Sequence, residues 1–197
     1  MKSLILGAAI ACAILFCGVA QADTVTLTYT YDYTDGGYFA PPDVILDHPP
    51  YYRGLDEDWG WTQELVTVPS NATGIVAATL SINAWDVDYY VSYPDISEVD
   101  VIYVNGVEVG ILDDTGGRNW VSTTFDLPES VLDDLWNDGE VDIYMDIDTD
   151  RGGSRVTLGE SVLNVTYTTG AVPEPATIGL LGIGALLALK RRRSRTC

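Results

Sequence analysis

The sequence predicts an all-β protein: a single β-sandwich or jelly roll with one short helix, flanked by two segments outside the sandwich. Three observations support this prediction. Most of the chain between residues 23 and 170 alternates apolar and polar residues with a period of two, as strands with one buried face do. Turn-forming residues separate these runs at short intervals. One stretch alone has a convincing helical period.

Seven to nine strands are expected in this region. The strongest hairpin signal is Asn105-Gly106, because this pair favours a type I′ turn between two alternating runs. The clearest strand patterns cover residues 24–33, 79–85, 100–104, 107–112, 121–127, 140–147 and 155–167.

The helix is expected at residues 129–137. Pro128 suits a first helical turn, Asp126 is a candidate N-cap, and Gly139 would end the helix. The residues expected to share its apolar face are Val131, Leu132, Leu135 and Trp136.

An irregular acidic loop is expected at residues 35–60, between the first strand and the rest of the domain. It contains four prolines, several glycines and many carboxylates. A loop of this length in a compact domain usually has a function or is mobile.

Residues 1–22 have the layout of a secretory signal peptide. A lysine precedes the apolar residues 4–16, and Ala20 and Ala22 form a small-x-small cleavage site for signal peptidase. Cys17 leaves a lipoprotein interpretation open, although the residues just before it are bulkier than lipoprotein signals usually have.

Residues 171–197 combine a short polar motif, an apolar stretch and a basic end. Pro173, Glu174 and Pro175 precede fourteen largely apolar residues, 176–189. The cations that follow are Lys190, Arg191, Arg192 and Arg193. As a helix the stretch would reach about 21 Å, and long basic side chains can extend to lipid headgroups. We therefore expect a membrane helix; a buried C-terminal helix is the alternative.

The order of these three parts resembles the PEP-CTERM sorting signal of exported bacterial proteins. The resemblance implies processing near residues 173–175 by exosortase, a membrane transpeptidase. It also implies a precursor anchored in the inner membrane and a later location on the cell surface or in extracellular matrix. Residues 77–167 resemble, in pattern, the galactose-binding-like jelly rolls of some proteins that carry this signal.

The region between the two signals is strongly acidic. Residues 23–174 contain four arginines, no lysine, no cysteine and 29 acids, which leaves a formal charge of −25. This charge excludes nucleic acid as an electrostatic partner, and the missing thiols exclude cysteine-bound metal. Cations, neutral glycans and basic proteins remain as partners.

The same inventory favours a protein that is not an enzyme. Cysteine and lysine nucleophiles are missing from residues 23–174, and the one histidine, His48, lies in the acidic loop. No nucleophile-elbow pattern is present. Carboxylate pairs of the kind that glycoside hydrolases use could form, but with 29 acids this signal has no specificity.

Two acidic groups are candidate calcium sites. Asp146, Asp148 and Asp150 alternate like the start of a calcium loop, but the later EF-hand positions do not match. Asp86 and Asp88 form the second group. Oxygen ligands alone would select Ca²⁺ over transition metals. The alternative is a pair of strands that each have one solvated acidic face.

Trp59 and Trp61 are candidate glycan-binding residues. On a strand they would share one face beside the acidic loop, where rings and carboxylates together could hold an extracellular polysaccharide. Burial in the core is the alternative. Trp85, Trp120 and Trp136 are expected in the core by their periodicity.

These features together predict an exported, non-catalytic protein of the cell surface or extracellular matrix, with a structural or adhesive role. A calcium-assisted carbohydrate-binding module is the alternative. A carboxylate glycoside hydrolase is a third and weaker hypothesis.

Overall fold

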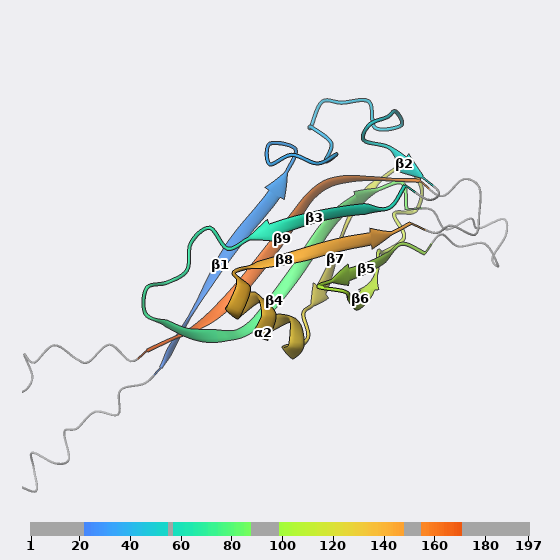
Figure 1. Cartoon of the computed structure of the whole chain (residues 1–197). Helices are drawn as coiled ribbons and strands as arrows, with labels where there is room; N and C mark the ends of the chain where they lie inside the picture. The colour runs from blue at the N-terminus through green and yellow to red at the C-terminus, as the bar shows by residue number, and fades with distance from the viewer. Residues whose placement is uncertain (1–21, 55–56, 88–98, 148–154, 171–197) are drawn as a thin grey trace, which may run out of the picture. The chain divides into compact units, whose positions relative to one another are not determined.

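The computed structural model describes residues 22–54, 57–87, 99–147 and 155–170, which contain nine strands and one helix (Figure 1). Residues 24–169 form one compact unit. The predicted all-β class with one short helix is confirmed. The elements are β1 Asp23–Asp32, β2 Arg53–Gly54, β3 Trp59–Glu64, β4 Ala72–Trp85, β5 Val101–Val104, β6 Val107–Ile111, β7 Trp120–Asp126, α2 Glu129–Asp138, β8 Glu140–Asp146 and β9 Arg155–Thr169.

The strands form two antiparallel sheets that pack as a sandwich. The first sheet has the order β1-β9-β4-β7, with β2 also paired to β9, and the second has the order β3-β8-β5-β6. In Figure 1, β3 and β8 lie in front of β9 and β4. The last strand, β9, lies between β1 and β4, so the first sheet is completed only when the C-terminal end of the domain is in place.

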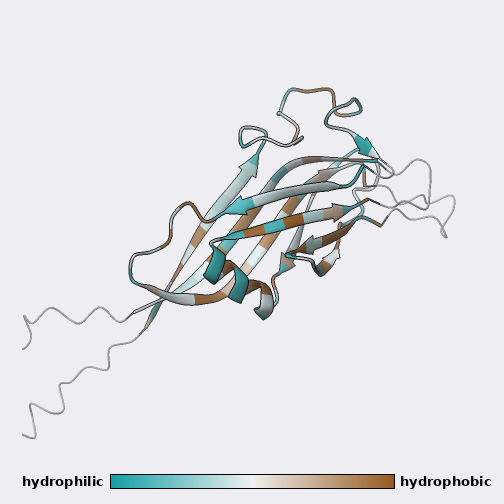
Figure 2. Cartoon of the chain, in the orientation of Figure 1, coloured by the Kyte–Doolittle hydropathy of each residue, from teal (hydrophilic) through white to brown (hydrophobic). Residues whose placement is uncertain are grey.

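The core lies between the sheets and follows from the period-two pattern. Figure 2 shows this alternation clearly along β8, where hydrophobic and hydrophilic residues follow one another. Burying one such side chain fully contributes about 1.5–3 kcal/mol. Core residues with at most 1% of their surface exposed include Leu80, Ile82, Ile143, Met145, Leu163 and Val165.

A buried polar network joins the two sheets inside this apolar core. The Gln63 side chain of β3 is 2% exposed. Its amide nitrogen donates to the backbone oxygens of Tyr29 at 2.7 Å and Ser161 at 3.3 Å. The Ser161 hydroxyl in turn donates to the Gln63 side-chain oxygen at 3.0 Å. A buried polar group is costly unless it is paired, so these bonds favour one position of β3 against β1 and β9 of the facing sheet.

The hairpin predicted at Asn105-Gly106 is confirmed. Asn105 has a φ of 50° and Gly106 a φ of 75°, which is the left-handed backbone of a type I′ turn. The turn joins β5 to β6, and β5 also pairs with β8.

Helix α2 begins at Glu129 and is ended by Gly139, as predicted, but its N-cap is a different residue. Gly139 has a φ of 75° and donates its N–H to the Leu135 oxygen at 3.1 Å. The N-cap is Pro128, without a side-chain hydrogen bond. The prediction of Asp126 as the cap is wrong, because Asp126 still pairs with Thr79 in the sheet.

The buried face of α2 is narrower than predicted. Val131 and Leu135 are completely buried, and Leu132 packs against the core at its edge. Trp136 is 40% exposed, so its predicted place in the core is wrong. One residue further along a helix turns the side chain by about 100°, which carries Trp136 away from the Leu135 side.

The segment at residues 35–60 is more ordered than an irregular loop. It contains β2, which pairs with β9, and it ends in β3. Phe39 is 1% exposed, and its ring centroid lies 5.2 Å from that of Trp61 and 5.9 Å from that of Trp59. The Ala40 N–H donates to the Leu158 oxygen at 2.7 Å. These contacts hold the segment against one end of the sandwich.

Among the residues that the structure describes, no helix is long and apolar enough to cross a membrane. The predicted membrane helix at residues 176–189 and residues 1–21 of the predicted signal peptide lie outside the described residues.

Candidate functional site

The predicted processing residues lie almost entirely outside the described part of the chain. Ala22 is described and is exposed directly before β1. Those outside are Ala20, Pro173, Glu174, Pro175, Lys190, Arg191, Arg192 and Arg193.

The predicted glycan site at Trp59 and Trp61 is not available to a ligand. The two rings share one face of β3, as predicted, but that face is the core, and they are 1% and 6% exposed. The Arg53 guanidinium lies 5.0 Å from the Trp59 ring centroid and 4.0 Å from that of Tyr38. Because Phe39 and Arg53 pack against these rings, no sugar can stack on them, and the prediction is wrong.

The structure describes two of the five predicted calcium ligands. Asp86 follows β4 and is 5% exposed, and Asp146 ends β8 and is half-buried. Asp88, Asp148 and Asp150 lie outside the described residues. In the described ranges, no three His, Cys, Asp or Glu side chains are grouped so that they could hold a metal ion.

Asp86 takes part in a contact between loop and sheet. It has a φ of 66°, and its carboxylate accepts a 2.6 Å hydrogen bond from the Tyr52 hydroxyl. Burial, and then this bond, raise the pKa of the Tyr52 phenol well above its ordinary value. The Arg155 guanidinium lies 5.4 Å from the Tyr52 ring centroid. Tyr52 is therefore a neutral hydrogen-bond donor that ties the segment before β2 to the end of β4.

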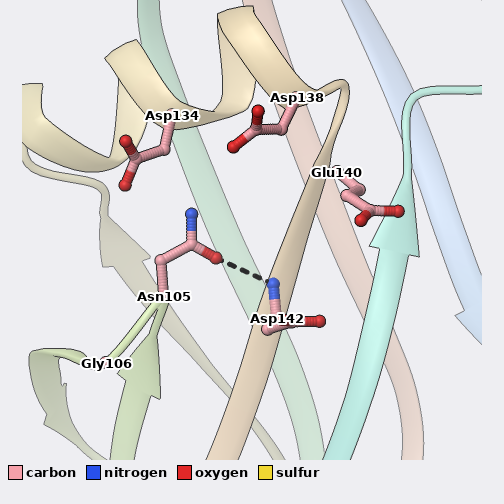
Figure 3. A pocket seen from close by; sticks show the side chains of 6 residues that line it. All are labelled: Asn105, Gly106, Asp134, Asp138, Glu140 and Asp142. Atoms are coloured by element: carbon pink, nitrogen blue, oxygen red, sulfur yellow. Dashed lines mark hydrogen bonds between the residues drawn. The ribbon is translucent and has the colours of Figure 1, made fainter.

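A pocket of about 440 Å³ opens between the end of α2, the β5–β6 turn and the start of β8 (Figure 3). The Asn105 side-chain oxygen accepts the Asp142 N–H at 2.9 Å, and the Thr62 hydroxyl donates to the Asp142 carboxylate at 2.6 Å. The lining residues are Asn105, Gly106, Asp134, Asp138, Glu140 and Asp142.

The chemistry of this acidic pocket is limited. Its carboxylates are exposed to solvent. Asp134 and Asp138 lie near the C-terminus of α2, where the helix dipole disfavours negative charge. The pocket would attract cations without holding them in a coordination shell. The sequence pattern predicts that the acids of β8 lie on a solvated face. It does not predict that the acids of α2 lie beside the β5–β6 turn, because these two segments are brought together only by the tertiary fold.

Trp85 is buried, as predicted, but Trp120 is not. Trp85 is 7% exposed and its ring lies 5.8 Å from that of Tyr52. Trp120 is 40% exposed at the start of β7, so its predicted place in the core is wrong. Its side chain lies on the same side of β7 as Ser122 and Thr124, which are exposed, rather than with buried Thr123 and Phe125.

Residues 171–194 match the PEP-CTERM protein-sorting motif. This confirms the resemblance found in the order of tripeptide, apolar stretch and basic end. The motif is the recognition signal for exosortase processing, and it marks the chain as an exported protein that is sorted by way of the membrane. A comparison with curated proteins finds no match.

Similar solved structures include a β-porphyranase of glycoside hydrolase family 86 from the human gut bacterium Bacteroides plebeius. It has a TM-score of 0.43 and 16% identity, over 76% of this chain and 22% of that one. Latent PorU of Porphyromonas gingivalis has a TM-score of 0.39 and 9% identity, over 75% of this chain and 13% of that one. The tobacco streak virus coat protein dimer has a TM-score of 0.36 and 15% identity, over 77% of this chain and 92% of that one. This chain thus spans less than a quarter of the first two.

Proposed function

We propose that the chain is the precursor of a non-catalytic structural or adhesive protein of the cell surface or extracellular matrix. The observation that carries the proposal is the sorting motif at residues 171–194, placed directly after the last strand of a compact sandwich. In this account signal peptidase removes residues 1–22 and exosortase processes the chain near residues 173–175. The working protein is then the sandwich without the basic tail.

The side chains of the sandwich support a role without catalysis. Residues 23–174 contain neither cysteine nor lysine, and His48 is exposed in the segment before β2. The Tyr52 phenol is a poor base because its raised pKa keeps it protonated. The acids of the pocket beside α2 are exposed and solvated, so they lack the burial that prepares a carboxyl group as a general acid.

Fractionation of host cells tests the sorting step. Replacing Pro173, Glu174 and Pro175 together with alanine should keep the protein in the membrane fraction, whereas the unchanged chain reaches the surface or medium. A matched control replaces Pro41, Pro42 and Asp43 with alanine, which removes the same kinds of residue from an ordinary segment of the domain. Surface delivery of the first variant at the normal level would refute the proposal.

A separate assay tests the absence of catalysis. Purified protein incubated with neutral and acidic polysaccharides should release no reducing ends. Turnover that is lost when Asp134 or Glu140 is replaced by the corresponding amide would establish the carboxylate hydrolase instead.

A further inference from the structure

An exposed tryptophan stands on the polar outer face of the first sheet. Trp120 shares this face with Ser122 and Thr124, whose hydroxyls contact the side chains of Asn83 and Ser81 on β4. Tryptophan is among the most buried residue types on average. A ring that is 40% exposed among hydroxyl and amide groups is therefore accessible to a ligand.

The ring is held in place by a glycine that leaves room for it. A β-carbon at Gly159 would lie 2.9 Å from Cζ3 and 3.2 Å from Cη2 of Trp120, closer than side chains tolerate. Gly159 sits at a bulge, because Asn83 pairs with Glu160 while Ala84 pairs with Leu158. The six-membered ring of the Trp120 indole thus packs on the β9 backbone at Gly159. The part of the indole that does not contact β9 includes the surface that is exposed to solvent.

Hydrogen-bonding side chains lie near the Trp120 ring on the same face of the sheet. The Asn83 amide nitrogen donates to the Ser122 hydroxyl at 2.9 Å, and the Asn83 oxygen would lie 2.8 Å from a β-carbon at Gly159. Glu160, the pairing partner of Asn83, is exposed. The Asn83 amide therefore lies close to the ring, and Ser122 and Glu160 are neighbours of Asn83 on the adjacent strands. Each of the three side chains keeps donor or acceptor capacity for a ligand.

The rest of the face continues as rows of uncharged polar side chains. The Thr26 and Thr166 hydroxyls are 2.8 Å apart, and Thr28 donates to Asn164 at 2.7 Å. In the described strands β4, β7 and β9, the acidic residues on this outer face are Asp126 and Glu160. The outward side of β8, by contrast, carries Glu140, Asp142 and Asp146. The outer surfaces of the two sheets thus differ in charge.

We propose that Trp120, Asn83, Ser122 and Glu160 form a binding site for a neutral polysaccharide, which continues across the hydroxyl rows of the sheet. Pyranose C–H groups carry partial positive charge and stack on the negative face of an aromatic ring. Sugar hydroxyls match the amide, hydroxyl and carboxylate groups beside it. A formal charge of −25 on residues 23–174 disfavours anionic polymers. A face rich in Ser and Thr differs from protein interfaces, which favour aromatic residues, Met and Arg.

This inference rests on the proposed adhesive role, because it names what the exported domain adheres to. The test uses the full chain purified in detergent micelles. Binding is measured by pull-down on cellulose and by affinity electrophoresis in laminarin and galactan, with alginate as the anionic comparison. Trp120→Ala should weaken binding to the preferred neutral polymer by about tenfold, the loss expected for one stacked ring.

Trp136→Ala is the matched control, since Trp136 is equally exposed but lies on α2. It should bind like the unchanged chain, and Trp120→Phe should retain binding because an aromatic surface remains. Thermal unfolding checks that each variant is folded. The inference is overturned by equal loss in both alanine variants, by stronger binding to alginate, or by binding to none of the neutral polymers. Normal surface delivery of a protein that binds no glycan would leave the proposed function standing.

Discussion

Gln63 offers the sharpest test of how the two sheets are held together. Its side chain crosses from β3 to the other sheet, where it bonds to the Tyr29 backbone and to Ser161. Replacing it with alanine removes these bonds and leaves the completely buried Ser161 hydroxyl without its acceptor.

The size of the effect follows from these contacts. Each lost hydrogen bond lowers the free energy of unfolding by about 0.5–1.5 kcal/mol, and an orphaned buried hydroxyl costs about 1–3 kcal/mol. We expect Gln63→Ala to lose about 2–4 kcal/mol. For a domain of this size that corresponds to a melting temperature lower by roughly 5–15 °C.

Thermal and urea unfolding followed by far-UV circular dichroism measure this change. Glu64→Ala is the control, because Glu64 is the exposed neighbour on the same strand and should change stability by less than about 0.5 kcal/mol. A double-mutant cycle with Ser161→Ala should give a coupling of about 0.5–3 kcal/mol. A Gln63→Ala protein as stable as the control, or a coupling of zero, would refute the bridging role.

Three further predictions concern the turn, a surface phenol and cations. Gly106→Val should lower the free energy of unfolding in urea by about 1–2 kcal/mol, because the turn needs a left-handed backbone there; unchanged stability would contradict this. The hydrogen bond to the Asp58 carboxylate raises the pKa of Tyr144 to about 12, so its stabilisation is complete below pH 10 and lost as the pH rises through about 12. The melting temperatures of the unchanged chain and Tyr144→Phe should therefore differ by a constant amount up to pH 10 and converge above it; a difference that grows with pH would be evidence against this. If calcium binds near Asp86 or Asp146, EDTA in salt-matched buffer should lower the melting temperature by several degrees, and an unchanged transition would rule it out.

Local signals in the sequence were sufficient for much of the fold. Asn105-Gly106 requires a turn with positive φ at both positions, and Gly139 ends a helix because glycine accepts the left-handed conformation. These features depend on a few adjacent residues. The strand pattern was equally local, although β4 extends further toward the N-terminus than its alternation indicated.

The tryptophans show where such reasoning fails. A period of two indicates which residues share a face, but it does not say which face is inside. Trp59 and Trp61 were predicted to bind a ligand because they lie beside the acidic loop, but the face that they share with Gln63 is the core. Trp120 was assigned to the core by its periodicity, although its neighbours on the same face are Ser122 and Thr124. Attention to those neighbours would have placed Trp120 on the surface.

The acidic pocket and the contact between Tyr52 and Asp86 were beyond local patterns for another reason. Each joins segments that are distant in the chain. The strand orders β1-β9-β4-β7 and β3-β8-β5-β6, which bring these segments together, are set by the packing of the whole sandwich. The sorting signal needed no such information, because its three parts are contiguous and their order alone identifies it.

The intact mass of the protein recovered from the surface or medium of its host tests the central claim most directly. We expect a chain that begins at Asp23 and ends near residues 173–175, with or without an attached group, and that lacks Lys190 and the residues after it. A surface protein that retains the basic tail, or a full-length chain found only in the membrane, would contradict export and sorting by this signal.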